Sequence, residues 1–242
     1  MKDFYNKIQA CTNQNRMVAL ATIIKGQGLG SKLLIYKDGL FEGDLGDSTL
    51  NDQVAILASQ VFNSQEPKRV DLTFRNEIIE LFIDVFPPLP KLIIIGAVHI
   101  AIPLVTMGKI AGYHTIVIDP RRAFAMRDKF NYAEELIVEW PTDALESVGI
   151  DEATCFVTLT HDEKIDNPSL AYALKSSARY IGALGSPKTH AKRKTALVEM
   201  GFTEEELQKI HSPIGLDIGA RGPHEIAISI IAEIVAQKHG KL

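Results

Sequence analysis

Cysteine is scarce in this sequence. The chain of 242 residues has two cysteines, Cys11 and Cys155, which lie far apart and form no Cys-x-x-Cys motif. A disulfide framework needs several spaced cysteines, and zinc–thiolate or iron–sulfur centres need clustered ones. The two cysteines therefore exclude a disulfide-stapled domain and a metal–thiolate cluster as the basis of the fold.

Strong net charge and long apolar runs are missing as well. The formal net charge is −4, with 26 basic and 30 acidic residues, so no global field favours nucleic acid. No segment stays apolar over the roughly 20 residues that cross a bilayer, and the first residues do not resemble a signal peptide. We therefore expect a cytoplasmic protein without stable membrane insertion and without a nucleic-acid partner.

The motifs of several large enzyme classes are also missing. The sequence has no Gly-x-Ser-x-Gly elbow, no Walker loop and no His-Glu-x-x-His pair. Nucleophilic hydrolysis and kinase chemistry therefore have no residues on which to rest.

A proline-rich segment divides the sequence into two expected domains. Residues 87–90 read Pro-Pro-Leu-Pro, which is stiff and cannot donate hydrogen bonds in a sheet. We predict a smaller N-terminal α+β domain over residues 1–86 and a larger domain over residues 91–242. The elements expected in the smaller domain are a helix over 4–11, strands over 17–25, 32–36 and 40–42, a helix over 52–62, and a hairpin over 69–76 and 77–86.

Residues 91–119 form the unit around which the larger domain is organised. Residues 92–95 are wholly apolar, as expected of a parallel strand buried on both faces, and Gly96 ends the run. A helix is predicted up to residue 110, followed by a second buried strand that ends at Asp119. In such a βαβ unit the first turn directs backbone N–H groups at a phosphate, and Asp119 is placed to accept hydrogen bonds from a ribose.

The dinucleotide fingerprint Gly-x-Gly-x-x-Gly/Ala is incomplete in this unit. Gly96 and Ala101 hold its first and third positions, but Val98 replaces the glycine that lets a pyrophosphate approach the backbone. The pattern favours a Rossmann-like fold and disfavours NAD(P). An NAD(P)-dependent oxidoreductase remains an alternative, because Arg121 and Arg122 follow Asp119 and suit a 2′-phosphate.

Strands and helices alternate through the rest of the larger domain, which implies a doubly wound parallel sheet. The further expected strands are 135–138, 154–159 and 180–184. The further expected helices are 121–129, 142–148, one capped by Asn167 with Pro168 first, 188–200, one from the capping box Thr203–Glu206 to 211, and 223–238.

The turn after the fifth expected strand is a candidate anion site. Gly185 permits a sharp turn, Ser186 is placed as a helix N-cap, and Pro187 takes the first helical position. Unpaired N–H groups and the helix dipole converge there beside Lys188. The alternative is an ordinary helix start, with the basic residues at 192–194 forming a solvated face.

Two further polar groups are expected at the same edge of the sheet. His161 and Asp162, with Asp166 nearby, follow the fourth expected strand, where ligands bind in such folds. They would hold a metal or a polar ligand, or form a polar surface loop. His99 lies in the first turn, where it either faces a ligand or caps the helix.

Several motifs of the larger domain occur in a fixed order. They are Gly-Ala-Val-His at 96–99, Thr-His-Asp at 160–162, Tyr-Ile-Gly-Ala-Leu-Gly-Ser at 180–186, Pro-Ile-Gly-Leu-Asp-Ile-Gly-Ala at 213–220 and Glu-Ile-Ala-Ile-Ser-Ile at 225–230. Together they resemble the XdhC/CoxI family of xanthine dehydrogenase accessory proteins over most of residues 91–242. The N-terminal part is similar more loosely, through residues 19–22 and 38–46.

The resemblance implies a maturation chaperone rather than an enzyme. Family members bind molybdenum cofactor, hand it after sulfuration to a xanthine dehydrogenase-type apoenzyme, and are often dimeric. A cysteine desulfurase and a second copy of the chain are the further partners implied. The ligand, molybdenum cofactor or a related phosphorylated molecule, would then be bound by Gly96, His99, Asp119, His161, Asp162, Gly182, Gly185, Ser186, Lys188 and Asp217.

The sequence departs from the family pattern at positions that matter for the ligand. The family turn Gly-Ala-Gly-His has Val98 at its third position here. A family stretch ending in Gly-Gly-Cys-Leu-Glu corresponds to residues 46–51, where Thr49 replaces the cysteine and Asn51 replaces the glutamate. We therefore expect no thiolate from residues 43–51 to reach a metal. A divergent, non-catalytic scaffold remains a further alternative.

Overall fold

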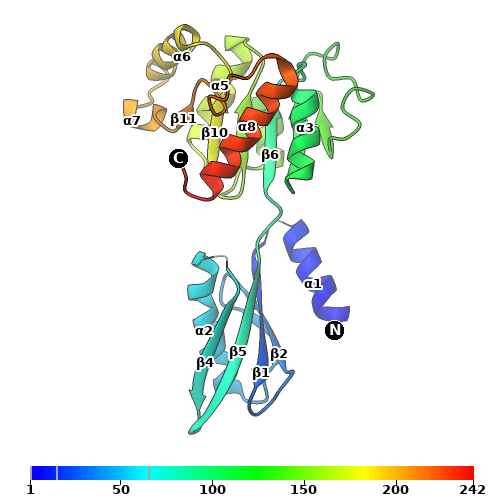
Figure 1. Ribbon diagram of the computed structural model, residues 1–242, viewed down its shortest axis with the longest axis vertical. Helices are drawn as coiled ribbons and strands as arrows, with labels where there is room; N and C mark the ends of the chain where they lie inside the picture. Colours follow the sequence, from blue (N-terminus) through cyan, green and yellow to red (C-terminus); the bar gives the residue numbers. More distant parts are fainter. Residues whose placement is uncertain (1, 15, 65) are drawn as a thin grey trace. The chain divides into compact units, whose positions relative to one another are not determined.

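The computed structural model describes residues 2–14, 16–64 and 66–242. These residues form two compact units, 1–89 and 90–242 (Figure 1). The boundary between the units falls inside the proline-rich segment 87–90.

The N-terminal unit is an antiparallel sheet of five strands in the order β3-β2-β1-β5-β4. Apolar and polar residues alternate along β5, as expected of a strand with two different faces. Helix α2 packs on one face through Val54, Ala58 and Val61, and α1 covers the other through Phe4 and Ile8. The elements are α1 (Lys2–Asn13), β1 (Val18–Lys25), β2 (Lys32–Tyr36), β3 (Phe41–Asp44), α2 (Ser48–Ser64), β4 (Lys68–Phe74) and β5 (Glu77–Phe86).

The C-terminal unit is a parallel sheet of six strands in the order β11-β10-β9-β6-β7-β8. This confirms the predicted Rossmann-like, doubly wound architecture. Its strands are β6 (Lys91–Ile95), β7 (His114–Ile118), β8 (Glu135–Ile137), β9 (Cys155–Thr158), β10 (Tyr180–Ala183) and β11 (Ile210–His211). Its helices are α3 (Ala101–Ile110), α4 (Pro141–Val148), α5 (Glu163–Leu174), α6 (Pro187–Glu199), α7 (Glu204–Leu207) and α8 (Gly222–Lys238).

The parallel sheet is buried on both faces, which explains why its strands are wholly apolar. Leu92 and Ile94 of β6 point to the face covered by α3 and α8, the pair in front in Figure 1. Ile93 and Ile95 point to the face covered by α4, α5 and α6. Because all six strands run the same way, the turns that follow them meet at one carboxyl edge.

One predicted helix of the C-terminal unit was wrong. Residues 121–129, all of them described, form separate turns instead. The N–H groups of Phe124, Lys129 and Phe130 reach carbonyl groups three residues back, so no continuous four-residue ladder develops. Arg121 is also held by a preceding residue, which fixes the start of the segment in a turn.

Helix α5 begins earlier than the sequence Asn167-Pro168 suggested. Asp162, and not Asn167, is its N-cap, and the Asp162 carboxylate accepts a hydrogen bond from the N–H of Lys164 at 3.0 Å. Pro168 therefore lies inside the helix, near its start, where it removes one N–H from the ladder.

Two other features of this unit differ from the prediction. His211 does not end a helix but belongs to β11, whose two residues pair with β10 and are too few to show a period. Arg193 does not belong to the solvated helix face considered as the alternative for residues 192–194, because only 3% of it is exposed. Within the described ranges 2–14, 16–64 and 66–242, no helix is long and apolar enough to cross a membrane.

Candidate functional site

The two central turns of the carboxyl edge lie in direct contact. β6 and β9 are neighbours at the point where the strand order reverses, which is where ligands bind in open parallel sheets. Gly96, after β6, has a φ of +110°, and a Cβ atom there would lie 2.6 Å from Cγ2 of Thr160, after β9. Glycine at position 96 is therefore required for these two turns to approach each other.

Asp119, at the end of β7, is fully buried and bonded within the protein. Its Oδ1 accepts hydrogen bonds from the backbone N–H and Nε of Arg121, both at 2.9 Å. Its Oδ2 accepts from Nη2 of Arg121 and from the backbone N–H of Ala97, both at 2.8 Å. No carboxylate oxygen is therefore exposed for the expected contact with a ribose, and Asp119 instead ties the turns after β6 and β7 together.

The accessible group at the end of β7 is a guanidinium. Burial favours a higher pKa for Asp119, but its hydrogen bonds with Arg121 and Ala97 outweigh burial and hold the pKa below its ordinary value. The Arg121 side chain is 29% exposed, and its Cζ lies 4.4 Å from the ring centroid of Phe124. A partly exposed guanidinium held on both sides is suited to a phosphate group.

The turn after β9 is strained. His161 has a φ of +61°, in the left-handed region that few residues other than glycine occupy. The Thr160 hydroxyl accepts from the N–H of Asp162 at 3.0 Å and donates to Oδ1 of Asp166 at 2.7 Å, which holds the turn on both sides. The His161 imidazole is exposed. Strain of this kind is found mainly at functional sites.

A buried charge pair links the turns that follow β9 and β10. Nη2 of Arg193, in α6, donates to the carbonyl oxygen of Leu184 at 2.9 Å and lies 3.8 Å from Oδ2 of Asp166, in α5. Burial raises the pKa of Asp166 and lowers the pKa of Arg193. Because Asp166 also binds Thr160, the pair sets the spacing of two turns that face the candidate site.

Hydrogen-bonding capacity remains unused around this pair. The buried atoms without a hydrogen-bond partner among the described residues include Thr158 Oγ1, Asp166 Oδ2, Asn167 Oδ1, His190 Nδ1 and Arg193 Nη1. Native proteins satisfy nearly all such atoms, so this polar region between α5 and α6 is unusual.

The turn before α6 has the predicted N-cap geometry, whereas anion binding there stays a prediction. Ser186 is the N-cap, and its hydroxyl accepts from the N–H of Thr189 at 3.2 Å, with Pro187 at the first helical position. Lys188 is exposed beside this N-terminus. A Cβ atom at Gly185 would lie 3.2 Å from Cβ of Thr189, so glycine lets the turn approach the first turn of α6.

The expectation of several unpaired N–H groups was wrong, because Pro187 has none, Thr189 donates to the Ser186 hydroxyl and His190 donates to the Ser186 carbonyl oxygen. The turn offers an anion at most the N–H of Lys188, together with the exposed Lys188 side chain.

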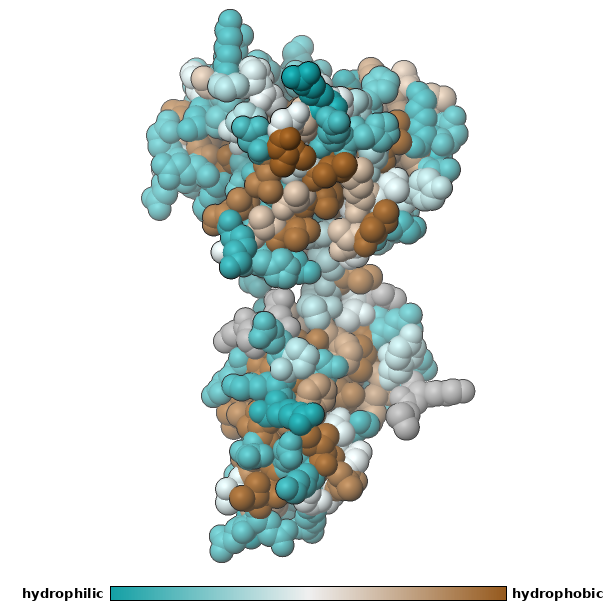
Figure 2. Space-filling view, viewed as in Figure 1, coloured by the Kyte–Doolittle hydropathy of each residue, from teal (hydrophilic) through white to brown (hydrophobic). Residues whose placement is uncertain are grey.

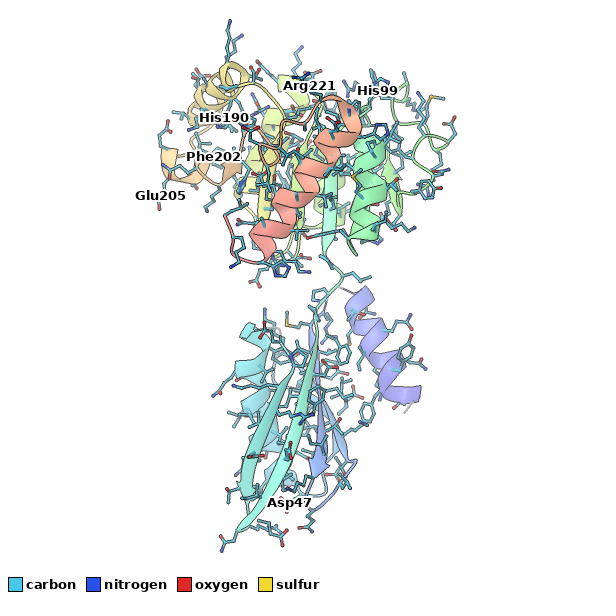
Figure 3. The ribbon with its side chains drawn as sticks, in the orientation of Figure 1. Asp47, His99, His190, Phe202, Glu205 and Arg221 are labelled. Carbon is cyan, nitrogen blue, oxygen red and sulfur yellow. The ribbon has the colours of Figure 1, made fainter. Side chains whose placement is uncertain are left out.

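Of the remaining candidate residues, His99 and Asp217 are exposed and Gly182 is buried. His99 is exposed in the turn before α3, and Figure 3 shows it at the same end of the unit as Arg221, the N-cap of α8. Asp217 is exposed in the loop before α8. Gly182 is buried within β10, and a Cβ atom there would lie 2.5 Å from Cδ1 of Ile214. Gly182 therefore serves packing in this structure rather than contact with a ligand.

Glu233 of α8 holds the loop that contains Asp217. Its carboxylate accepts hydrogen bonds from the Tyr180 hydroxyl and, at 2.7 Å, from the N–H of Gly215, and lies 3.3 Å from Nδ1 of His211. Burial favours a higher pKa for Glu233, but these partners outweigh it and lower the pKa. Glu233 is therefore a buried acidic residue of α8 that serves to hold the structure together.

The N-terminal unit has a small cavity at the tip of its sheet. The cavity measures about 180 Å³ and is lined by Gln27, Gly28, Ser31, Leu45, Gly46, Asp47, Leu50, Phe74, Arg75 and Ile79. Asp47 caps α2 through the N–H of Thr49 at 2.9 Å and pairs with Arg75 at 2.5 Å. Asn51 is buried and accepts from the N–H of Leu45 at 2.9 Å. The family cysteine and glutamate positions are thus occupied by a hydroxyl and a structural amide.

Neither cysteine is presented to a ligand. Cys11 and Cys155 are both buried, and burial raises the pKa of Cys155 to about 11. Across residues 2–14, 16–64 and 66–242, no group of three or more His, Cys, Asp or Glu side chains is arranged to hold a metal ion. The carboxyl edge therefore offers basic side chains and backbone donors, which suit an anionic ligand.

Comparisons with known proteins agree with the motifs. The sequence family described as "XdhC Rossmann domain" matches residues 92–234. The sequence family described as "XdhC and CoxI family" matches residues 11–73. A probable xanthine dehydrogenase subunit of Bacillus subtilis (strain 168) is 28% identical over 231 residues, which are 96% of this chain and 64% of that protein. The molybdenum cofactor insertion chaperone PaoD of Escherichia coli (strain K12) is 38% identical over 93 residues, which are 38% of this chain and 29% of that protein.

The chain thus spans 64% or less of the length of these curated relatives. A crystal structure of a xanthine dehydrogenase from Bacillus halodurans is similar in fold, with a TM-score of 0.57 and 22% identity. The match covers 98% of this chain and 96% of that one.

Proposed function

This chain belongs to the XdhC and CoxI family, and from that membership we propose that it is an accessory protein in the maturation of a xanthine dehydrogenase-type molybdenum hydroxylase. It binds molybdenum cofactor, or a related phosphorylated ligand, and transfers it to the apoenzyme. The similarity to an insertion chaperone and to a protein named for xanthine dehydrogenase supports this role.

The convergence of anion-binding groups at the carboxyl edge carries the proposal. The start of α6 contributes Ser186 and Lys188, the turn after β7 contributes the guanidinium of Arg121, and the strained turn after β9 exposes His161. Cationic side chains on neighbouring turns, with a backbone N–H group at a helix start, favour binding of a phosphate group.

The residues of this edge fit the phosphate part of molybdenum cofactor. They offer no thiolate to its metal, because Cys11 and Cys155 are buried and Thr49 occupies the family cysteine position. The cofactor supplies the redox chemistry of the client enzyme, and this chain holds and orients it through its phosphate. His99, Gly96, Asp162 and Asp217 complete the ligand-binding edge, with Asp119 fixing Arg121 and Gly182 fixing the loop beyond β11.

The partners follow from the same role. The client is a xanthine dehydrogenase-type apoenzyme, a cysteine desulfurase acts on the bound cofactor, and the accessory protein works in the cytoplasm as a homodimer. An NAD(P)-dependent oxidoreductase finds less support, because Val98 stands at the close-approach position and Asp119 is occupied by Arg121.

A retention experiment tests cofactor binding. The full chain is mixed with molybdenum cofactor released from a molybdenum enzyme, separated by gel filtration, and assayed for the fluorescence of the oxidised pterin. Lys188→Ala should reduce retention on the order of tenfold, as expected for a lost charge-assisted contact. Lys192→Ala is the matched control, because Lys192 is also exposed on α6.

Transfer is tested with a cofactor-free molybdenum hydroxylase. Addition of the loaded chain should restore its activity faster than free cofactor does. If the unaltered chain retains no cofactor yet still accelerates maturation, the scaffold alternative replaces cofactor delivery. If it does neither, the proposed function is wrong.

A further inference from the structure

A cavity lies at the amino edge of the parallel sheet, where the strands begin, opposite the candidate site. It measures about 450 Å³ and is lined by the segments that lead into β10 and β11 and by the last turn of α8. In Figure 2, apolar residues cover the middle of α8, whereas hydrophilic residues surround its end. Small-molecule sites measure roughly 300–1,000 Å³, so this cavity has room for a small molecule rather than a single ion.

The lining of the cavity is basic. Arg179 precedes β10, Lys209 precedes β11, and His211 lies in β11. Among the described residues that line the cavity, none carries an acidic side chain. Nε of Arg179 donates to the backbone carbonyl oxygen of Glu152 at 3.1 Å, which fixes one side of the guanidinium. The cavity therefore gathers positive charge, which suits an anion.

The imidazole of His211 is held from two sides. Its Nδ1 lies 3.3 Å from Oε1 of Glu233, and its ring stacks on the ring of Tyr180, with the centroids 4.7 Å apart. Glu233 is buried and does not line the cavity. With Nδ1 directed at this carboxylate, Nε2 is the ring nitrogen that remains for a ligand, and it donates a hydrogen bond when the ring is protonated. An anion in the cavity would favour that protonated form.

The acidic residue nearest in sequence to Lys209 is already bound elsewhere. Oε2 of Glu206 accepts hydrogen bonds from the N–H of Thr203 at 2.8 Å and from its hydroxyl at 3.0 Å. These bonds, with a smaller effect of Lys209, lower the pKa of Glu206. The capping box of α7 therefore holds this carboxylate, and no described lining residue supplies a counter-charge to Lys209.

The uncharged lining residues indicate what kind of anion fits. Ser176, Ser177, Gln208 and Gln237 offer hydroxyl and amide groups, which form hydrogen bonds with the hydroxyl groups of a polar molecule. No phenylalanine, tyrosine or tryptophan is found among the described lining residues, so a nucleobase would lack an aromatic surface on which to stack. The lining therefore suits a phosphorylated, hydroxyl-rich molecule better than a nucleotide.

We propose that the amino-edge cavity binds a small phosphorylated molecule of the sugar-phosphate class. Arg179, Lys209 and His211 bind its phosphate group, because cationic side chains on neighbouring loops form charge-assisted hydrogen bonds with phosphate oxygens. The serine and glutamine side chains bind the hydroxyl groups. The cavity lies at the opposite edge of the sheet from the turns proposed to bind the cofactor. It is therefore an additional site, and it does not depend on the proposed function.

Titration calorimetry of the full chain with glucose 6-phosphate tests the site. The parent should bind this probe, and Lys209→Ala and Arg179→Ala should each weaken binding on the order of tenfold, because each removes a charge-assisted contact. Lys129→Ala is the matched control, because Lys129 is also exposed but lies between β7 and β8, at the other end of the sheet. Thermal melting shows whether each variant remains folded. Should Arg179→Ala unfold, the exposed Lys209 still decides the result.

Three further probes test the chemistry of the ligand. Glucose should bind on the order of tenfold more weakly than glucose 6-phosphate, because it lacks the charged group. Inorganic phosphate should also bind more weakly, because it has no hydroxyl-rich body. AMP should bind more weakly because its base finds no aromatic partner. Equal or tighter binding of any of the three would overturn the assignment to the sugar-phosphate class.

Filling the cavity separates a built site from general attraction of anions. Ser177→Trp adds bulk at an exposed lining position and keeps all of the basic side chains, so it should abolish binding. Binding that survives Ser177→Trp, or a parent that does not bind, would overturn the proposal. A loss with Lys188→Ala but not with Lys209→Ala would also overturn it, because the probe would then occupy the carboxyl edge. Lys209→Ala should retain molybdenum cofactor as the parent does, so this proposal and the proposed function can fail separately.

Discussion

Arg121 donates three hydrogen bonds to the carboxylate of Asp119, from its backbone N–H, Nε and Nη2. The acidic residue that usually faces a ribose in this kind of sheet is thereby enclosed, and the basic residue two positions later is left at the surface. The carboxyl edge consequently presents a partly exposed guanidinium rather than a carboxylate at the end of β7.

Asp119→Asn should lower the free energy of unfolding at neutral pH by about 1–3 kcal/mol, because one partner of a buried charge-assisted network is lost. The hydrogen bonds depress the folded-state pKa of Asp119, so its contribution is present above the unfolded pKa of about 3.9 and is lost as pH falls through the folded pKa. Urea unfolding at pH 7 and at low pH measures this. An equal pH dependence in parent and variant would contradict it.

NAD and NADP should bind poorly to the parent and better to Val98→Gly, because Val98 blocks close approach of a pyrophosphate to the backbone. Titration calorimetry of both proteins gives the comparison. Tight binding of NAD by the parent would contradict both this prediction and the preference for a cofactor chaperone.

Gly96→Ala should destabilise the protein by about 1–3 kcal/mol, through a left-handed φ and a clash with Cγ2 of Thr160. Gly112→Ala is the matched control, because Gly112 also has a positive φ but nothing lies within 4 Å of its added Cβ. Thr160→Ser removes the clashing methyl group and keeps the hydroxyl, so it should recover part of the loss in Gly96→Ala. Thermal unfolding of the three single variants and of the Gly96→Ala/Thr160→Ser double variant decides whether the contact or the φ dominates.

Arg193→Met should destabilise the protein by about 3–5 kcal/mol, because it leaves Asp166 buried and unpaired. Adding Asp166→Asn should recover part of this loss, since the remaining group is then neutral. Chemical denaturation of the single and double variants measures the coupling. A loss below about 1 kcal/mol for Arg193→Met would show that the pair contributes little in solution.

Alkylation of the cysteines should leave ligand binding unchanged. Cys11 and Cys155 are buried, so modification requires local opening, and neither faces the carboxyl edge as an exposed thiol. Retention of molybdenum cofactor before and after treatment with iodoacetamide gives the result. Loss of retention with the fold intact would identify one of them as a ligand.

The fold was predictable because its strongest signals are local. Three of these signals each determine the structure within a few residues, and the structure confirms all three. They are the apolar run 92–95, the Ser186 cap and the Thr203–Glu206 capping box. β11 was not predictable, because two residues have no period and its pairing depends on β10.

The position of the candidate turns was predictable, but the contacts among their side chains were not. The sequence located the turns at one edge, since parallel strands impose this, but not which side chains would bind one another. Asp119 was interpreted as a ligand contact because nothing local shows that Arg121 folds back onto it. Arg193 was hidden in a basic run, although its spacing of four from the buried Leu197 places both on one side of α6 and could have indicated burial.

Helix α8 starts at the carboxyl edge, where its N-cap Arg221 lies at the same end as His99 (Figure 3). Glu233 of the same helix accepts a hydrogen bond from the N–H of Gly215, so α8 anchors the loop that leads into it. The helix thus works as a clamp on its own entry loop, and a substitution that frees Glu233 should release Asp217 and the rest of that loop together.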